Sequence, residues 1–356
     1  MLPYWLMFLF PSVGALVGLG QHRKGQRRDQ AFLVLLFVVF AVIMGLRDGT
    51  GGDFYNYQKT IDMIAIQSVG TSMSGSDPAF TLLAIVSNWL GFYLYGVNFV
   101  CAVLLLYGLL RFVRTMPDPW LAIAAAVPYM IIVVGMGYIR QGVAIGFILL
   151  AMIDLDRKSY GWLAFHMLAA LTFHIAAICM LPVLGFGLLR RQPAVLVVLG
   201  FLGALAYWFI LRERFAGLYQ GYVVDQYDSS GALIRLLMNV VPAVVFLAFR
   251  RRFPIAEPAK TTWTVIALVT LGLLGLLAVS PSSTWIDRLG LFFSPIQLVV
   301  FGYLTTVFAA DPREQRIAAF LGVLFYGAVL FVWLNYADNA GSWLPYRWIF
   351  SPDRLA

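Results

Sequence analysis

Charged residues are scarce in this chain of 356 residues. They make up 12% of the sequence, whereas hydrophobic residues make up 61% and aromatic residues 15%. Because a soluble domain carries about 25% charged residues, this composition excludes a soluble globular protein. Apolar stretches of about 15 to 23 residues recur along the whole chain, near the length of about 20 that a helix needs to cross the hydrocarbon layer. We therefore predict an all-α, polytopic membrane protein with a single integral membrane domain, residues 1–356.

Cysteine and histidine are also rare. The two cysteines and three histidines exclude a disulfide framework, and no group of residues has the spacing of metal ligands. The glycine-rich stretch 49–52 is followed by no lysine and preceded by no strand, which excludes a P-loop for nucleotide phosphates. We predict that the protein uses no metal and no cofactor.

Positive charge is in excess, with a net charge of +8. The basic residues lie in short loops between apolar stretches, where they set topology, so we predict no binding of nucleic acid. Because basic loops stay in the cytoplasm, this pattern gives about 12 spans with both termini on the periplasmic side of a bacterial inner membrane. The basic clusters are at 22–28, 111–114, 157–158, 190–191, 250–252 and 313–316. The predicted spans are 3–20, 30–46, 94–113, 119–136, 140–155, 159–173, 175–190, 193–211, 232–250, 260–279, 287–309 and 317–334.

A further apolar stretch, PAFTLLAIVSNWLGF at 78–92, cannot be a full span. One more crossing would place Arg111 and Arg114 outside, against the charge rule. We predict that this stretch is a re-entrant or interfacial helix within an external loop, 47–93. The other predicted external segments are the loop 212–231 and the C-terminal tail 335–356.

Most ionisable residues outside the basic loops gather at the outer ends of the predicted spans. An ionisable group inside a membrane costs a few kcal/mol and usually marks a functional path. The stretch LRDGTGGDFYNY at 46–57 is the densest part of this polar ring. The ring consists of Arg47, Asp53, Arg140, His174, Arg235, Asp287 and Arg288.

The same residues carry a resemblance to a known family. GLRDGTGGDFYNY at 45–57, YIRQGVA at 138–144 and the pair Phe173-His174 resemble, in order and spacing, the EpsG family of bacterial exopolysaccharide biosynthesis. Members of that family are regarded as Wzy-like polymerases. IDRLGLFF at 286–293 and WLPY at 343–346 are similar to its C-terminal pattern, so the resemblance covers most of the chain. This chain departs from the pattern by one extra glycine before Asp53.

The resemblance implies a GT-C-like helical bundle and a glycosyltransferase similar to O-antigen polymerases and ligases. Such enzymes use polyprenyl-diphosphate-linked oligosaccharides rather than nucleotide sugars, and act at the outer face of the inner membrane. Besides this substrate and the lipid bilayer, the implied partners are a chain-length regulator and export proteins. Whether the reaction inverts or retains the anomeric centre does not follow from the resemblance.

The chemistry of such a transfer suggests roles for the polar ring. A leaving diphosphate needs positive charge, and Arg47, Arg140 and Arg288 lie at the same predicted depth; arginine stays charged and meets phosphate oxygens bidentately. The general base is either His174 or Asp53. Further candidates for contact with the substrate are Tyr55, Tyr57, Gln141, Arg235, Asp287, Trp343 and Tyr346.

Two other functions stay open at this point. A flippase or other transporter of lipid-linked oligosaccharides would line the bilayer midplane with its polar residues. A membrane acyltransferase that modifies polysaccharide would turn a reactive histidine to cytosolic acyl-CoA. Reporter fusions at Ser76 and Arg191, predicted to lie outside and inside respectively, would separate these functions from a polymerase.

Overall fold

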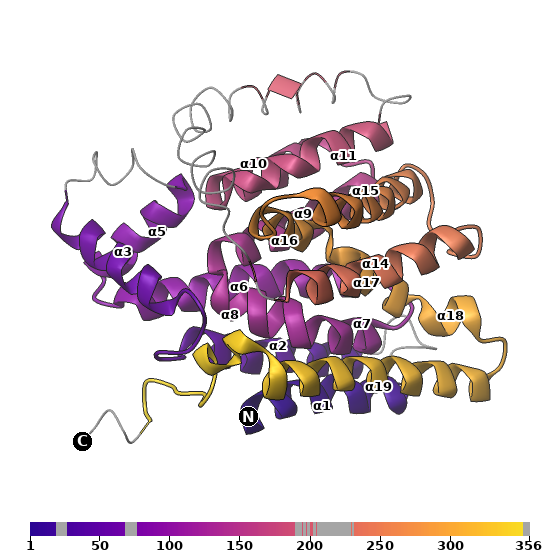
Figure 1. The fold of residues 1–356 in the computed structure, drawn as a ribbon, viewed down its shortest axis with the longest axis horizontal. Helices are drawn as coiled ribbons and strands as arrows, with labels where there is room; N and C mark the ends of the chain where they lie inside the picture. The colour runs from indigo at the N-terminus through magenta and orange to yellow at the C-terminus, as the bar shows by residue number, and fades with distance from the viewer. Residues whose placement is uncertain are drawn as a thin grey trace.

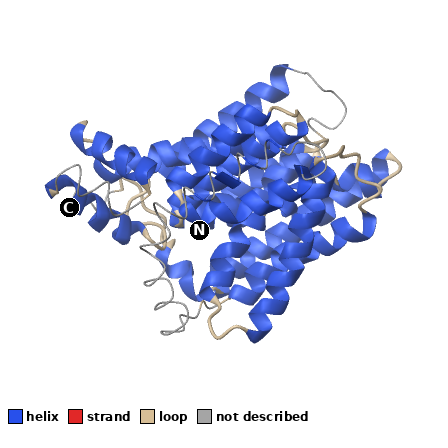
Figure 2. Ribbon diagram, turned by 90° about the horizontal axis from the view of Figure 1, so that it is seen from above, coloured by secondary structure: helices blue, strands red, loops and turns tan. Residues whose placement is uncertain are grey.

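The computed structural model describes residues 1–18, 27–67, 77–188 and 231–351, together with residue 229 and a few isolated positions between 194 and 204. Throughout these ranges the regular structure is helical, and the one bridge between extended segments joins Arg47 to Trp348. Figure 2 shows helices filling nearly all of the described chain. The predicted all-α fold class is confirmed.

The first half of the chain packs its helices in neighbouring pairs. α6 lies against α9 and α2, and α9 also lies along α10. Figure 1 shows α3 and α5 at one end of the bundle, on the same side as the C-terminal tail. The helices of this half are α1 (Leu2–Leu16), α2 (Arg27–Gly45), α3 (Phe54–Ile66), α5 (Pro78–Trp89), α6 (Tyr93–Val113), α7 (Pro119–Ala126), α8 (Gly135–Gly137), α9 (Ile139–Asp156), α10 (Tyr160–Phe173) and α11 (Met180–Leu188).

The second half packs on the first through α7, which α17 and α19 both contact. α14 also packs against α15 and α17, so these helices form one body with the first half. The helices of this half are α14 (Ala232–Phe249), α15 (Ala259–Val279), α16 (Thr284–Gly290), α17 (Pro295–Gly302), α18 (Leu304–Phe308) and α19 (Pro312–Tyr336).

The helical segment Pro119–Gly137 occupies the centre of the bundle. Every residue of its most apolar window is buried, which is the expected place for a helix that is apolar on all sides. Between α7 and α8 the chain forms a π-helical stretch, Val127–Val134. Such wider turns are rare in proteins, and those that occur are often found near functional sites.

Among the residues that the structure describes, six helical segments are long and apolar enough to cross a membrane, and five shorter apolar helices accompany them. The prediction of about 12 spans is therefore not confirmed as a count, although the predicted ranges other than 193–211 coincide with helices. The range 193–211 and most of the predicted loop 212–231 lie outside the described residues. The six segments are Tyr93–Val113, Pro119–Gly137, Ala232–Phe249, Ala259–Val279, Thr284–Gly302 and Pro312–Tyr336.

The stretch predicted as a re-entrant or interfacial helix forms α5, which has 12 residues. At 1.5 Å per residue it is about 18 Å long, shorter than the hydrocarbon core of about 30 Å. Its length agrees with the prediction, and its depth in the membrane stays a prediction.

Candidate functional site

Two of the predicted polar motifs, those of Arg140 and His174, meet around a buried carboxylate, that of Asp77. Its side chain is 3% exposed, and Oδ2 accepts a hydrogen bond from Nη1 of Arg140 at 3.0 Å. Nδ1 of His174 lies 3.7 Å from the same oxygen, and the backbone N–H of Ile175 donates to Oδ1 at 3.4 Å. Three distant segments of the chain thus come together at one acidic group.

The local sequence explains why Asp77 would pass for an ordinary helix cap. Three helices begin with an aspartate followed by proline, because proline fits the first helical position and aspartate caps the free N–H groups. Asp118 accepts from the N–H of Leu121, and Asp311 caps α19 in the same way. The Asp77 carboxylate makes no such bond to α5. It is turned to Arg140 and Ile175 instead, which marks it for a different role.

Arg140 is held from several sides. Tyr138 breaks the helix between α8 and α9, so that Arg140 stands in the first turn of α9. Its guanidinium carbon lies 5.6 Å from the ring centroid of Tyr57 and 5.5 Å from that of Phe80, within the range of cation–π attraction. Burial raises the pKa of the Tyr57 phenol, which therefore stays neutral. One third of the Arg140 side chain remains exposed, at 33%, and is open to a ligand.

His174 lies in a break between α10 and the 3-10 turn Ile175–Cys179, where its backbone is extended. Its ring stacks on Phe292, with centroids 6.1 Å apart and planes at 18°. Nδ1 is buried without a hydrogen-bond partner, while the side chain as a whole is 24% exposed. The distance of 3.7 Å to Asp77 is too long for a hydrogen bond, but catalytic hydrogen bonds are often long before a substrate is bound.

Arg288 approaches the same region from α16. It is exposed, and its guanidinium carbon lies 5.8 Å from the ring centroid of Tyr138. None of the ion pairs among the described residues includes it. Nε2 of Gln141 donates to the Arg288 backbone carbonyl at 2.7 Å, which ties the start of α9 to α16. Arg288 therefore presents a free positive charge.

Arg235 and Asp287 form a bidentate ion pair. Nε and Nη2 of Arg235 each donate to one oxygen of Asp287, both at 2.8 Å. Ser229 completes the cluster, because its hydroxyl accepts from Arg235 at 2.6 Å and donates to Asp287 at 2.9 Å. The two charges balance each other, so this pair adds no net charge beside Arg288.

Arg47 does not join the other predicted arginines at an accessible surface. It is 0% exposed, and its guanidinium donates to the carbonyls of Met44, Thr50 at 3.0 Å and Met136 at 2.8 Å, and to the side chain of Asn98 at 3.1 Å. Burial lowers its pKa to about 10, which still leaves it charged at neutral pH. The arginine ties α2, α6 and α8 together. We therefore leave it out of the proposed diphosphate site.

Trp343 and Tyr346, predicted as substrate contacts, hold the C-terminal tail in place. Trp343 is 1% exposed, and its indole N–H donates to the carbonyl of Ile132 in the π-helical stretch at 3.1 Å. The Tyr346 hydroxyl donates to the carbonyl of Ile43 at 2.8 Å. These contacts occupy both polar groups inside the protein, so neither residue is part of the proposed site.

The tail pairs directly with the loop that follows α2. Arg47 bridges to Trp348 in antiparallel fashion, and the N–H of Asp48 donates to the carbonyl of Arg347 at 3.0 Å. Positive φ angles of 57° at Gly49 and 117° at Gly51 turn the loop back over the bundle. Glycine adopts such angles without a steric penalty, and a Cβ at Gly51 would collide with the Met136 carbonyl.

The returning loop carries Asp53 and Tyr55 to the rim of the site. Asp53 is half-buried at the start of α3, and its Oδ1 accepts from Nδ2 of Asn56 at 3.2 Å. Burial, and then the charge of Asp53, raises the pKa of Tyr138, so Asp53 acts on the same ring that Arg288 covers. Tyr55 is 61% exposed. Both side chains are therefore accessible to a ligand.

A second histidine–carboxylate pair lies at the far end of α9. Nδ1 of His166 is 2.6 Å from Oδ2 of Asp154, and the ring stacks between Phe147 and Trp162. Because α9 has 18 residues, its ends are about 27 Å apart. This pair is thus separate from the Asp77 site. Within the described ranges, no three His, Cys, Asp or Glu side chains lie close enough together to hold a metal ion.

Comparison with known proteins gives one family. The model described as the EpsG family matches residues 30–348, a range that includes all of the motifs above. Neither the search of curated proteins nor the search of solved structures gave a match.

Proposed function

The chain belongs to the EpsG family, and from this premise we propose that it is a polysaccharide polymerase, a glycosyltransferase of the bacterial inner membrane. Its substrate is an oligosaccharide linked to a polyprenyl diphosphate, and its acceptor is a second repeat unit. The family and the apolar helices support a polymerase-like role in a membrane. The lipid-linked substrate, the periplasmic face, the GT-C-like architecture and partners for chain length and export are the parts that we add.

One observation carries the proposal: Asp77, Arg140 and His174 meet at one end of the bundle although they come from three distant segments. A carboxylate that has a guanidinium and an imidazole each within 4 Å of it is suited to binding an anion and moving a proton. α9 starts at this end and α10 ends there, so the cluster lies at the ends of helices rather than midway along them. This position suits a reaction at the membrane surface better than a path through the bilayer.

In the proposed reaction, a hydroxyl oxygen of the acceptor sugar attacks the anomeric carbon of the donor glycan. The bond from that carbon to the diphosphate oxygen breaks, and its electron pair leaves with the polyprenyl diphosphate. The hydroxyl proton passes to a general base. No metal is needed for this balance if cationic side chains stabilise the leaving diphosphate.

We assign the general base to His174 and the orientation of its ring to Asp77 and Phe292. A carboxylate facing one imidazole nitrogen fixes the ring and leaves the other nitrogen for the substrate, the arrangement that serine hydrolases use. Asp53 is the alternative base, since it lies half-buried near Tyr138.

We assign the diphosphate to Arg140 and Arg288. Arg140 donates to Asp77 through Nη1 and its Nε is buried, so the exposed third of its side chain is the part available to phosphate oxygens. Arg288 is exposed and free of carboxylates in the described part of the chain. Both guanidinium groups are linked to the short segment 138–141, because Arg288 covers the ring of Tyr138.

The test is chain extension by the purified protein. The protein is incubated with a lipid-diphosphate repeat unit and a chelator, and products are separated by size. We expect a ladder of longer lipid-linked glycans and release of polyprenyl diphosphate. A single unchanged band with intact substrate would contradict the proposal. In proteoliposomes, movement of the substrate without a ladder would favour a flippase, and acyl transfer from acyl-CoA would favour an acyltransferase.

A further inference from the structure

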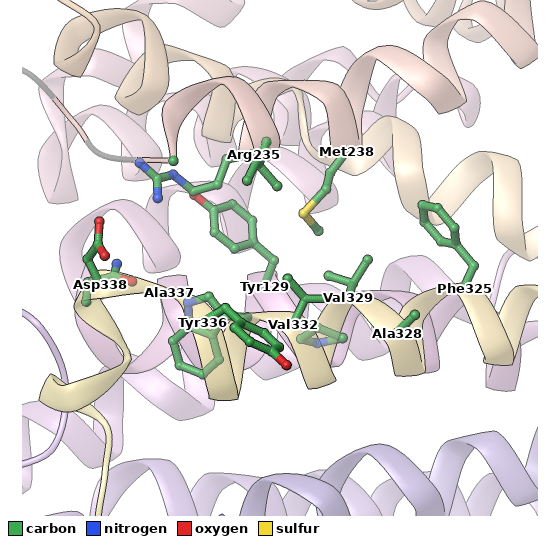
Figure 3. A pocket seen from close by; sticks show the side chains of 15 residues that line it. Tyr129, Arg235, Met238, Phe325, Ala328, Val329, Val332, Tyr336, Ala337 and Asp338 are labelled. Carbon is green, nitrogen blue, oxygen red and sulfur yellow. The ribbon is translucent and has the colours of Figure 1, made fainter.

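A cavity of about 470 Å³ lies between α14, α19 and the π-helical stretch. Figure 3 shows it as a groove with α19 along one wall, and with the side chains of Tyr129 and Met238 pointing into it. The groove is lined mostly by apolar side chains, among them Met238, Phe325, Val329 and Val332. A groove of this composition suits an apolar ligand.

The groove has a polar end and an apolar end. Arg235 and Asp338 lie at one end of Figure 3 and Phe325 lies at the other. Its wall on α19 runs from Phe325 to Tyr336, which corresponds to about 17 Å of helix at 1.5 Å per residue. α14 begins and α19 ends near the polar end. The groove therefore runs from the end of the bundle that carries the polar site along helices long enough to cross the membrane.

The polar end joins the site described above. Arg235 lines the groove and holds Asp287 bidentately. The next residue, Arg288, carries the free guanidinium. Because Asp287 neutralises Arg235, that arginine adds no net charge to the groove wall, and Asp338 lies at the polar end, away from an apolar chain. An anionic head group at the mouth of the groove then meets Arg288.

We propose that this groove, named the α14–α19 groove, holds the first isoprene units of the polyprenyl diphosphate substrate. This inference rests on the proposed function and adds the place of the lipid chain. One ligand then accounts for both the apolar groove and the exposed Arg288, because its diphosphate reaches Arg288 while its isoprenoid tail lies along α19.

The groove acts through orientation rather than hydrophobic affinity. A lipid chain in a bilayer is already surrounded by apolar groups, so moving it against a protein gives little hydrophobic gain. Close packing along the groove instead fixes the direction of the chain. The anomeric carbon is then presented beside Arg140 and His174 in a repeatable position.

The experiment uses a sugar-free polyprenyl diphosphate that carries a photoreactive diazirine on an early isoprene unit, with the full-length protein in nanodiscs. We expect crosslinks on peptides of α14 and α19. Ala328→Trp fills the groove and should reduce these crosslinks at least tenfold. Leu268→Trp is the matched control, because it adds the same indole to the exposed surface of α15, away from the groove.

Binding of geranyl diphosphate, whose tail is short, should be unchanged in Ala328→Trp. Val332→Trp, on the same wall, serves as a second variant if Ala328→Trp folds poorly. The assignment is overturned if the crosslinks fall on other helices, or if both groove variants crosslink as fully as the unmodified protein. It is also overturned if excess phosphatidylglycerol competes with the probe as well as unlabelled polyprenyl diphosphate does. The probe carries no sugar, so labelling does not depend on glycosyl transfer. If the groove is labelled but the chain-extension assay gives no ladder, the assignment of the groove stands and the proposed polymerase activity is contradicted.

Discussion

Oδ2 of Asp77 lies 3.0 Å from Nη1 of Arg140, which joins the residue before α5 to the first turn of α9. The contact spans 63 positions of the chain. The carboxylate is buried, whereas its arginine partner is one third exposed. The buried Asp77 therefore positions the partly exposed guanidinium of Arg140. Loss of the acid would free that cation and remove the group that faces His174.

We first predict that Asp77→Asn lowers chain extension by about 100-fold or more, because the amide keeps the shape but neither holds Arg140 nor faces His174 as an anion. Initial rates of ladder formation measure this effect. Asp62→Asn removes the same charge from an exposed position on α3 and should leave the rate unchanged. Normal extension by a well-folded Asp77→Asn protein would show that the ion pair only supports the fold.

A second prediction concerns the general base. His174→Ala should lower the rate by about 100- to 10,000-fold, the usual contribution of proton transfer. Binding of polyprenyl diphosphate should persist, since the imidazole is not assigned to the phosphates. Rates and binding are measured on the same preparation. If His174→Ala extends chains normally while Asp53→Asn does not, Asp53 is the base.

Third, the diphosphate contacts should respond to geometry as well as charge. Arg140→Lys keeps the charge but loses the bidentate fork, so we expect strongly impaired extension. Arg288→Ala should weaken diphosphate binding by about 1.5 to 3 kcal/mol, the range for hydrogen bonds to charged groups. Ladder formation measures the loss of extension, and isothermal titration with a soluble prenyl diphosphate measures the affinity of each variant. Arg251→Ala, an exposed arginine in a loop between α14 and α15, is the control, and equal affinity in all proteins would remove the arginines from the site.

A fourth prediction treats Arg47 as part of the fold. Arg47→Met removes a cation whose donors satisfy buried oxygens on three elements. Each lost bond to a charged donor is worth about 1.5 to 3 kcal/mol, so the variant should unfold at a clearly lower temperature and express poorly. Thermal unfolding in detergent is the measurement. A variant with normal stability but lost diphosphate binding would return Arg47 to the binding site.

The helices could be predicted from the sequence because long apolar runs leave few alternatives in a membrane. The same runs could not distinguish Arg47 from Arg140. Each follows an apolar stretch directly, and what separates them is tertiary: Arg47 finds a carbonyl on Met136, 89 positions away, whereas Arg140 finds a carboxylate and a partly open surface.

Asp77 was missed for a related reason. An aspartate before proline reads as a helix cap, and its different role depends on where α9 and α10 place Arg140 and His174. The signal in the sequence that could have identified Asp77 was an acidic residue directly before the predicted re-entrant or interfacial helix. Trp343 shows the opposite case, since its likeness to a family motif gave no sign that the indole is buried against Ile132.

The pairing of the tail with the loop after α2 also determines when this loop can reach its final structure during synthesis of the chain. Thr50 accepts from the N–H of Arg347, and the two residues are 297 positions apart. The ribosome therefore adds 297 residues after Thr50 before the loop that bears Asp53 acquires this support. A growing chain already holds Asn98 and Met136, the earlier acceptors for Arg47, but not the stretch 343–349. The end of the bundle that carries Asp53 is thus completed late, and a translation product that stops before residue 343 lacks the supports for the loop at the rim of its own candidate site.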